Sequence, residues 1–174
     1  MGIPGKPERS VLFVGMLSGE PELFDVVTRF LVRKFGPVHL ESKVVPFDFT
    51  DYYTPEMGGG LQRKFVAFQR SIFPNRISEI KVFTNKLERK YSQKKRRRIN
   101  LDPGYLTPAK VVLASTKNFS HRIYLGRGIY AETTFICHKN RFEPLPWTYP
   151  DYRTEVYLEF FQTLRKLAKS INHK

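Results

Sequence analysis

The sequence predicts an α+β fold: a ferredoxin-like βαββαβ core with a C-terminal hairpin extension and a terminal helix. Its first hundred residues show apolar patterns in the order strand, helix, strand, strand, helix, strand, which is the order of a split βαβ sheet. Hydrophobic residues are 41% and aromatic residues 14% of 174, enough for one sizeable core. No repeat or linker divides the chain. We therefore expect a flexible lead over residues 1–10 and a single globular domain over residues 11–174.

The first three predicted elements are a strand, a helix and a strand. Residues 11–17 (VLFVGML) form a continuous apolar run with β-branched and aromatic side chains, which is typical of a buried strand. Residues 21–35 repeat apolar side chains at helical spacing, and Pro21 suits a first helical turn. A Gly-Pro pair ends this helix. Residues 38–49 then alternate loosely between apolar and polar, as in a second strand.

The other three core elements are a strand, a helix and a strand. The pattern at residues 61–70 fits either a helix or a strand, and we favour a strand because glycines 58–60 and the Pro-Asn pair at 74–75 bracket a short element. Residues 76–92 carry an apolar stripe at helical spacing. The run RRINL at 97–101 resumes as a strand.

Beyond this core, the pattern predicts a helix, a hairpin, a strand and a last helix. A Thr-Pro pair suits the start of a short helix over residues 107–114. Residues 122–126 and 128–137 flank an Arg-Gly turn and predict a hairpin, to which residues 141–145 could add a third strand. Thr154 precedes a long stripe of apolar residues that predicts the terminal helix.

Charge and composition limit the classes of partner. Thirty Lys and Arg against 16 Asp and Glu give a formal net charge of +14, which favours a polyanionic or phosphate-bearing partner. A soluble protein with a Lys/Arg-rich surface explains the charge equally well. One cysteine permits no intrachain disulfide. The start of the chain lacks the apolar core of a secretory signal, and no apolar run is long enough for a membrane span. We expect a cytoplasmic protein with no membrane partner.

A basic cluster follows the second predicted helix. Residues 86–98 contain eight Lys and Arg and one acid, which is half of the formal net charge. Such a run attracts nucleic-acid phosphates by releasing their counterions. The alternative is a solvated helix end and loop, because cations stabilise a helix C-terminus. The candidate nucleic-acid contacts are Lys94, Lys95, Arg96, Arg97 and Arg98.

The segment over residues 99–132 packs many different ionisable and hydrogen-bonding side chains between short apolar runs. Asp102 begins an Asp-Pro-Gly sequence that is typical of a turn. A turn between a strand end and a helix start presents backbone N–H groups to anions. Histidine titrates near neutrality and suits acid–base chemistry. The candidate catalytic residues are His121 and Asp102. The candidate ligand-binding residues are Asn100, Tyr105, Lys110, Lys117, Arg122 and Glu132.

Each of these residues also has a structural interpretation. Asp102 could belong to a simple turn, and His121 could be a loop residue bonded to backbone. Glu132 breaks an apolar strand pattern, so its carboxylate needs a partner. Arg122 or Lys117 would serve, in a structural ion pair.

The sequence gives little support for a metal site or for a P-loop nucleotide site. The acidic residues are spaced in no tight metal motif, although oxygen ligands from separate loops can hold a divalent ion; they are Asp48, Asp51, Glu56, Asp102 and Glu132. We assign no metal ligand and leave a divalent metal cofactor open. The chain contains no GxxxxGK[ST] loop, so nucleotide hydrolysis of the P-loop type has no scaffold.

Several long strings are specific enough to indicate a family. They are NLDPGYLTPAKVVLASTKNFSHRIYLGRGIYAE at 100–132, WTYPDYR at 147–153, FTDYYTPEMG at 49–58 and FTNKLE at 83–88. With these strings the chain resembles, over nearly its whole length, a conserved prokaryotic family of unknown function, domain of unknown function 4416. The resemblance implies a single cytoplasmic domain and brings no established activity.

The leading functional hypothesis is a protein that binds a phosphate-bearing ligand, a nucleotide or RNA, through a polar site in residues 100–132. The first alternative is a non-catalytic RNA- or DNA-binding module that uses the basic run 94–98. The second is a scaffold or interaction protein without a pocket. The sequence leaves open whether the protein is an enzyme, and it leaves the oligomeric state open.

Overall fold

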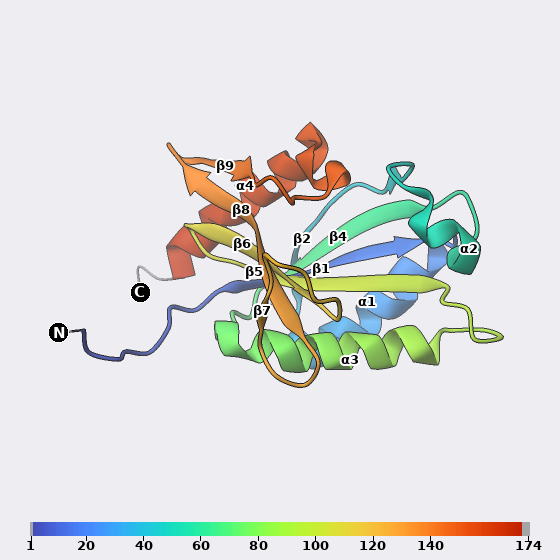
Figure 1. Cartoon of the computed structure of the whole chain (residues 1–174), viewed down its shortest axis with the longest axis horizontal. Helices are drawn as coiled ribbons and strands as arrows, with labels where there is room; N and C mark the ends of the chain where they lie inside the picture. The colour runs from blue at the N-terminus through green and yellow to red at the C-terminus, as the bar shows by residue number, and fades with distance from the viewer. Residues whose placement is uncertain (1, 172–174) are drawn as a thin grey trace.

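The computed structural model describes residues 2–171, and within them nine strands form one antiparallel sheet. The α+β class predicted from the sequence is confirmed. The strands lie in the order β2-β4-β1-β5-β6-β8-β7, with β3 paired to β4 and β9 paired to β8 (Figure 1). The strands are β1 (Val11–Ser18), β2 (Val38–Glu41), β3 (Val45–Pro46), β4 (Gln62–Phe68), β5 (Ile99–Leu106), β6 (Lys110–Ser115), β7 (Ile123–Tyr124), β8 (Tyr130–His138) and β9 (Arg141–Pro144).

Four α-helices and three short 3-10 turns connect these strands within the described residues. The helices are α1 (Glu22–Phe35), α2 (Thr54–Met57), α3 (Ile77–Lys90) and α4 (Glu155–Ile171), and the turns are η1 (Asp51–Tyr53), η2 (Pro74–Arg76) and η3 (Pro150–Arg153). The predicted hairpin is present as β7 and β8, the added strand as β9 and the terminal helix as α4. The predicted strand over residues 38–49 is divided into β2 and β3.

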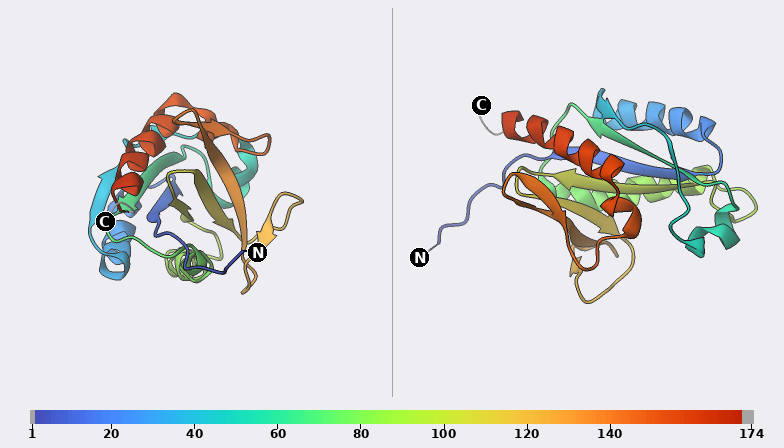
Figure 2. Two further views of the ribbon diagram at one scale, coloured as in Figure 1. Left: turned by 90° about the vertical axis from the view of Figure 1, so that its left-hand side faces the viewer. Right: turned by 90° about the horizontal axis from the view of Figure 1, so that it is seen from above.

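The centre of the sheet is buried on both faces, because β1 is apolar from Val11 to Leu17. Every residue of β1 is buried, and successive side chains of a strand point to opposite faces. Leu12 and Val14 pack into a core formed with α1 and α3, whereas Val11 and Phe13 pack into a second core formed with α4. The end-on view shows the curved sheet between α4 on one side and α3 on the other (Figure 2).

The sheet forks between β5 and β6. These strands pair only where Gly104 to Leu106 meet Leu113 to Val111. Beyond that point β6 follows β8, with Ser115 opposite Tyr130, while the first half of β5 stays paired with β1. The first half of β5 therefore has an outer edge without a neighbouring strand.

Two side chains of α3 take the place of the missing strand. The Leu101 N–H donates to Oε1 of Glu88 at 2.8 Å, and the Leu101 carbonyl accepts from Nζ of Lys81 at 2.7 Å. Both α3 side chains are buried. The peptide groups of a buried strand need hydrogen-bond partners, and here an ammonium and a carboxylate supply them.

Two predictions for this region are wrong. Residues 107–114 do not form a helix; they turn into β6, whose β-branched run pairs with β5 on one side and β8 on the other. Residues 102–104 are not a turn; they lie within β5. Pro103 is tolerated there because its nitrogen lies on the same edge of β5 as that of Leu101. Among the described residues no strand pairs with this part of the edge, so the missing N–H of proline breaks no hydrogen bond between strands.

Gly104 sits at the point where the fork closes. A Cβ atom there would lie 2.4 Å from Cζ of Phe13 and 2.5 Å from the carbonyl oxygen of Val112. The phenyl ring belongs to the core, and the carbonyl belongs to the neighbouring strand. Only a residue without a side chain lets β5 and β6 approach this closely.

Replacing Gly104 by Ala should lower the free energy of unfolding by about 1–3 kcal/mol, the usual effect of overpacking a core. The matched control is Gly59→Ala, because a Cβ at Gly59 meets no atom within 4 Å. Urea unfolding followed by circular dichroism measures both. Equal stability of the two variants would contradict this account of the fork.

Candidate functional site

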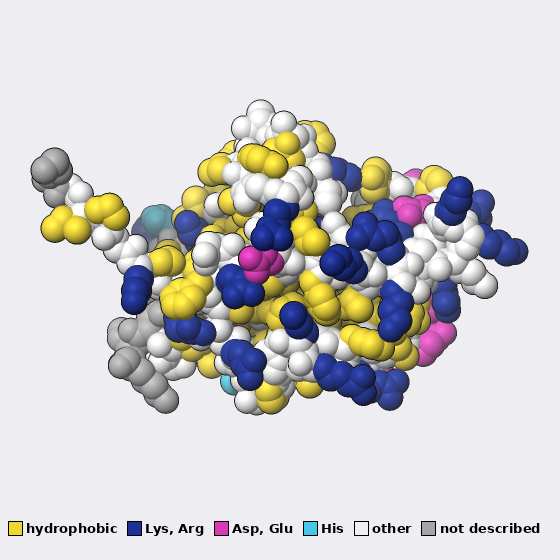
Figure 3. Space-filling model, turned by 90° about the horizontal axis from the view of Figure 1, so that it is seen from below, with side chains coloured by type: hydrophobic (Ala, Val, Ile, Leu, Met, Phe, Trp, Pro, Cys, Tyr) yellow, Lys and Arg dark blue, Asp and Glu magenta, His cyan; other side chains and the backbone are white. Residues whose placement is uncertain are grey.

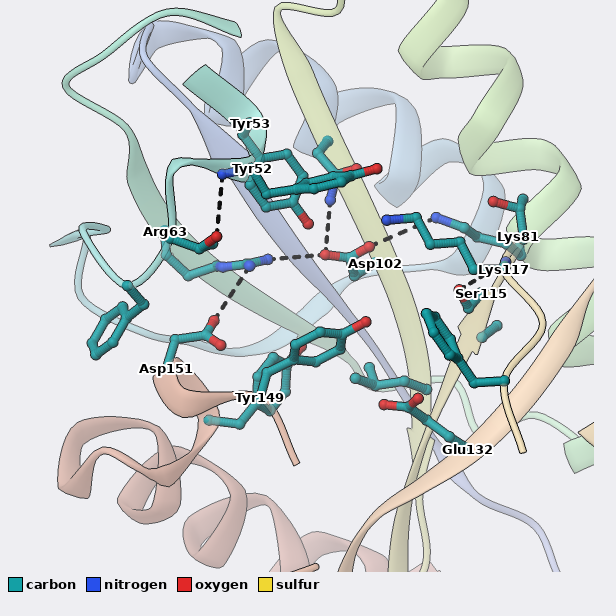
Figure 4. A pocket seen from close by; sticks show the side chains of 18 of the residues that line it. Tyr52, Tyr53, Arg63, Lys81, Asp102, Ser115, Lys117, Glu132, Tyr149 and Asp151 are labelled. Carbon is teal, nitrogen blue, oxygen red and sulfur yellow. Dashed lines mark hydrogen bonds and ion pairs between the residues drawn. The ribbon is translucent and has the colours of Figure 1, made fainter. Parts of the chain in front are cut away.

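A cavity of about 810 Å³ occupies the fork. Ligand pockets for small molecules usually measure about 300–1,000 Å³. Its walls come from β5, β6, α3, the segment over residues 47–53 and the segment over residues 147–152 (Figure 4). Segments far apart in the sequence thus meet at one place because the sheet divides there.

One polar cluster surrounds Asp102 at the floor of the cavity. Its Oδ2 accepts from Nη1 of Arg63 at 3.0 Å and from Nδ2 of Asn100 at 2.8 Å. The other Arg63 nitrogen, Nη2, donates to Oδ2 of Asp151 at 3.3 Å. Arg63 and Asp151 are almost fully buried, while 24% of the Asp102 side chain is exposed. Asp102 is the most exposed of the carboxylates that line the cavity, so it is the one that a ligand can reach.

The cluster continues toward α3 and α2. Nζ of Lys81 lies 3.7 Å from Oδ1 of Asp102 and 3.7 Å from Oε1 of Glu88. Arg97 donates to both carboxylate oxygens of Glu56, at 2.7 and 2.6 Å, and to Oδ1 of Asn100 at 2.8 Å. Three cations and four carboxylates thus alternate in this cluster, so that each ion faces an opposite charge, as buried ions require.

The acids of this cluster have shifted pKa values. Burial alone would raise the pKa of Asp102, but the Lys81 ammonium and the Arg63 guanidinium bring it below its usual value. Burial raises the pKa of Glu88 despite the Lys81 ammonium, and it raises the pKa of Asp151 despite the Arg63 guanidinium. Asp102 thus remains a carboxylate well into the acidic range, so it suits accepting hydrogen bonds better than exchanging a proton near neutral pH.

A second polar cluster is built around Arg122 and Glu132, whose side chains are each 2% exposed. Nε of Arg122 donates to Oε2 of Glu132 at 2.6 Å, so the ion pair predicted from the strand pattern is present. Arg122 Nη1 also donates to Oγ of Ser115 at 3.1 Å and to the carbonyl of Lys117 at 2.9 Å. Its Nη2 donates to the Tyr149 hydroxyl at 2.9 Å. Arg122 thereby ties the loop after β6 to β8 and to the segment before η3.

Two aromatic rings and one carboxylate hold His121. Its ring is stacked against Trp147, with centroids 5.0 Å apart and planes at 9°, and against Phe119, at 6.0 Å and 7°. Its Nε2 lies 3.1 Å from Oε2 of Glu132. A histidine fixed in this way has a defined orientation at the wall of the cavity.

Lys117 and Arg89 are the cavity cations without an acidic partner: among residues 2–171, no carboxylate lies within 4.0 Å of either charge. Nζ of Lys117 instead lies 3.8 Å from the ring centroid of Tyr52, a cation–π contact that connects the loop after β6 with η1. Arg89 lines the cavity from α3 and is exposed.

The structure brings six of the eight predicted catalytic and ligand-binding residues to the cavity: Asn100, Asp102, Lys117, His121, Arg122 and Glu132. Tyr105 and Lys110 do not line it. Asp102 and Gly104 share one face of β5, and Tyr105 lies on the opposite face because side chains alternate along a strand. The Tyr105 side chain therefore packs against the core formed with α1 and α3. Lys110 lies at the far end of β6 and is exposed.

The basic run is divided by the structure. Lys94, Lys95 and Arg96 are exposed in a turn after α3. Arg97 is paired with Glu56 and lines the cavity, and Arg98 is paired with Glu20.

Sequence reasoning missed several residues that build the cavity, because they come from other parts of the chain: Arg63, Lys81, Glu88 and Asp151. A usable signal existed for three of them. Arg63 interrupts a buried strand, and Lys81 and Glu88 lie on the buried side of α3. The argument that a charged residue on an apolar face needs a partner, applied to Glu132, would have selected these as well.

Among the described residues, no group of three or more His, Cys, Asp or Glu side chains is placed to hold a metal ion. In the same part of the chain, no helix has the length and apolar character needed to cross a membrane.

Fold and cavity together define a small α+β protein with a charge-rich cavity in a forked sheet. The chain belongs to the family described as domain of unknown function (DUF4416), whose model matches residues 8–167. This confirms the resemblance found in the sequence. A search of curated proteins and a search of solved structures found no match.

Replacing Arg63 by Met should destabilise the fold by about 3–5 kcal/mol, because Asp102 and Asp151 would lose the guanidinium between them. The control is Arg76→Met, since Arg76 pairs with Glu79 at the surface and such pairs contribute less than about 1 kcal/mol. Chemical unfolding of both variants measures the difference. A loss at Arg63 no larger than at Arg76 would contradict the structural role of this cluster.

Proposed function

We propose that the protein binds a small phosphate-bearing ligand with a planar ring, of which a nucleotide is the simplest class, in the cavity of the fork. The observation that carries the proposal is the pair of cavity cations without an acidic partner, Lys117 and Arg89, in a cavity walled by aromatic rings.

The charges favour an anion. Arg63, Lys81, Arg97 and Arg122 each lie within 4.0 Å of a carboxylate, so their charge is already balanced. Lys117 adds positive charge that the wall leaves unbalanced. A phosphate group would supply the missing negative charge through charge-assisted hydrogen bonds.

The aromatic residues favour a planar group. Eight of the lining residues are Phe, Tyr or Trp: Phe47, Phe49, Tyr52, Tyr53, Phe119, Trp147, Tyr149 and Tyr152. Tyr52, Phe119 and Trp147 are at least 38% exposed. Exposed rings at a cavity offer stacking surfaces to a heterocyclic base. Asp102, which a ligand can reach, would accept from a hydroxyl or amino group of the same ligand.

We also propose that the first part of the fold is ferredoxin-like. The neighbouring strands β2-β4-β1-β5 and the helices α1 and α3, which follow β1 and β4 in the chain, support this assignment. A cytoplasmic location remains a prediction from the sequence.

The alternative function is binding of RNA or DNA by the basic run. The exposed turn at Lys94, Lys95 and Arg96 favours it. So does the face on which α3 lies, where Lys and Arg side chains outnumber acidic ones (Figure 3). The run has no interleaved aromatic residues, which weakens a role as a platform for stacked bases.

A thermal-shift screen with nucleotides, sugar phosphates and inorganic phosphate tests the cavity proposal, because a ligand of the native state raises the melting temperature. Lys117→Ala should weaken the binding of the best ligand about tenfold or more, since a hydrogen bond to a charged group contributes roughly 1.5–3 kcal/mol. Lys110→Ala is the matched control: it removes an exposed lysine at the other end of β6 and should bind like the parent. No shift with any compound, or equal weakening by both variants, would refute the proposal.

The nucleic-acid alternative predicts a different result. Binding of a labelled single-stranded RNA, measured by fluorescence anisotropy, should then fall steeply with salt and should be lost when Lys94, Lys95 and Arg96 are changed to Gln. We expect these changes to leave nucleotide binding in the cavity unchanged. If they abolish it while Lys117→Ala does not, the basic run is the site.

A further inference from the structure

The hydrogen bond between His121 and Glu132 fixes which ring nitrogen carries the proton. Oε2 of Glu132 accepts from Nε of Arg122 at 2.6 Å and faces Nε2 of His121 at 3.1 Å. A carboxylate oxygen in an ion pair with a guanidinium is an acceptor, so Nε2 of His121 must be the donor. In the neutral ring, Nδ1 then carries the lone pair.

No hydrogen bond to this lone pair is present within the described residues. Nδ1 of His121 has no partner there, whereas Nε2 faces Glu132 and two aromatic rings stack on the imidazole. The His121 side chain is 19% exposed and lines the cavity. Buried polar atoms usually have a hydrogen-bond partner, so an Nδ1 without one at the cavity wall is available to a ligand or a water molecule. The orientation of one nitrogen by a carboxylate, with the other left available, is the arrangement of a general base.

The ion pair does not need this histidine. Arg122 already neutralises Glu132, and both side chains are 2% exposed. Two aromatic rings nevertheless stack on the imidazole beside the carboxylate. These contacts restrict the plane of the ring, and a fixed orientation favours proton transfer by a base.

We propose that His121 is a general base for the hydrolysis of a phosphate ester bound in the cavity; this inference rests on the proposed function. A water molecule gives a proton to Nδ1 of His121 as its oxygen forms a bond to phosphorus. The ester P–O bond breaks, and the departing oxygen leaves with the electron pair and takes a proton from solvent. The imidazolium then releases its proton to solvent.

The neighbouring groups have distinct roles in this step. Glu132 orients the ring and stabilises the imidazolium, and Arg122 holds Glu132. Lys117 would neutralise the charge that grows on the phosphate oxygens. The charged groups that face His121 are Glu132 from β8 and Arg122 beside it, and the Tyr149 hydroxyl reaches them through Arg122.

The test uses the full chain and a panel of nucleoside 2′-, 3′- and 5′-monophosphates, which are phosphate esters, with release of inorganic phosphate as the readout. His121→Asn should lower the rate about 100-fold or more, the usual contribution of a general base, while the thermal shift by the same nucleotide is kept. The control is His138→Asn. His138 also faces a carboxylate, that of Glu143 at 3.1 Å, but it lies exposed outside the cavity, so this variant should hydrolyse at the parent rate.

The outcomes separate the two proposals. If a nucleotide binds but no phosphate is released at any pH between about 5 and 9, or if His121→Asn keeps the parent rate, the general-base inference is wrong and the binding proposal stands. If no member of the panel binds, the binding proposal fails and the inference fails with it. Nitrogen-15 NMR of the imidazole gives a test without substrate: a neutral His121 ring with its proton on Nδ1 would overturn the inference.

Discussion

The structure depends on two hydrogen bonds at Leu101, in which side chains of α3 replace the backbone partners that a neighbouring strand would supply. Where β6 leaves β5, Glu88 accepts from the Leu101 N–H and Lys81 donates to the Leu101 carbonyl. A buried strand edge without such partners would carry unsatisfied peptide groups, each at a cost of roughly 1–3 kcal/mol. Because α3 satisfies them, the sheet can divide inside the protein, and the cavity occupies the space between the two arms. The same side chains then need counter-charges, and the cavity wall therefore contains a network of ions.

The fold could be predicted well wherever apolar periodicity is the deciding signal, as in β1, α3 and α4. It was mispredicted at residues 102–114, and both errors have one cause. Local propensity favours a turn at an Asp-Pro-Gly sequence and a helix start at a Thr-Pro pair. The pairing of β6 with strands on both sides overrides this local propensity. Pairing between distant segments cannot be predicted from the neighbouring residues alone. Pro103 and Gly104 lie at the fork. At Pro103 no N–H donor is needed, and at Gly104 the missing side chain lets β5 and β6 approach each other closely.

The candidate site was predictable only along one stretch of chain. Six residues between Asn100 and Glu132 converge on the cavity because β5, β6 and β8 are neighbours around the fork. Tyr105 does not reach the cavity because side chains alternate along β5. This could not be foreseen, since the sequence predicted a turn at that place and not a strand. The partners Arg63 and Asp151 come from elements that only the tertiary fold brings near. An unbalanced charge on a buried face is the sequence signal for such residues, although it does not identify the partner.

The central claim is that both arms of the fork form one binding site for a phosphate-bearing ligand. An NMR titration of the nitrogen-15-labelled protein with the nucleotide that binds best tests it most directly. The account predicts that amide signals shift on both arms together, over residues 100–102 of β5 and 114–117 at the end of β6, with one common dissociation constant. Shifts confined to the basic turn over residues 93–98, with both arms unchanged, would contradict it.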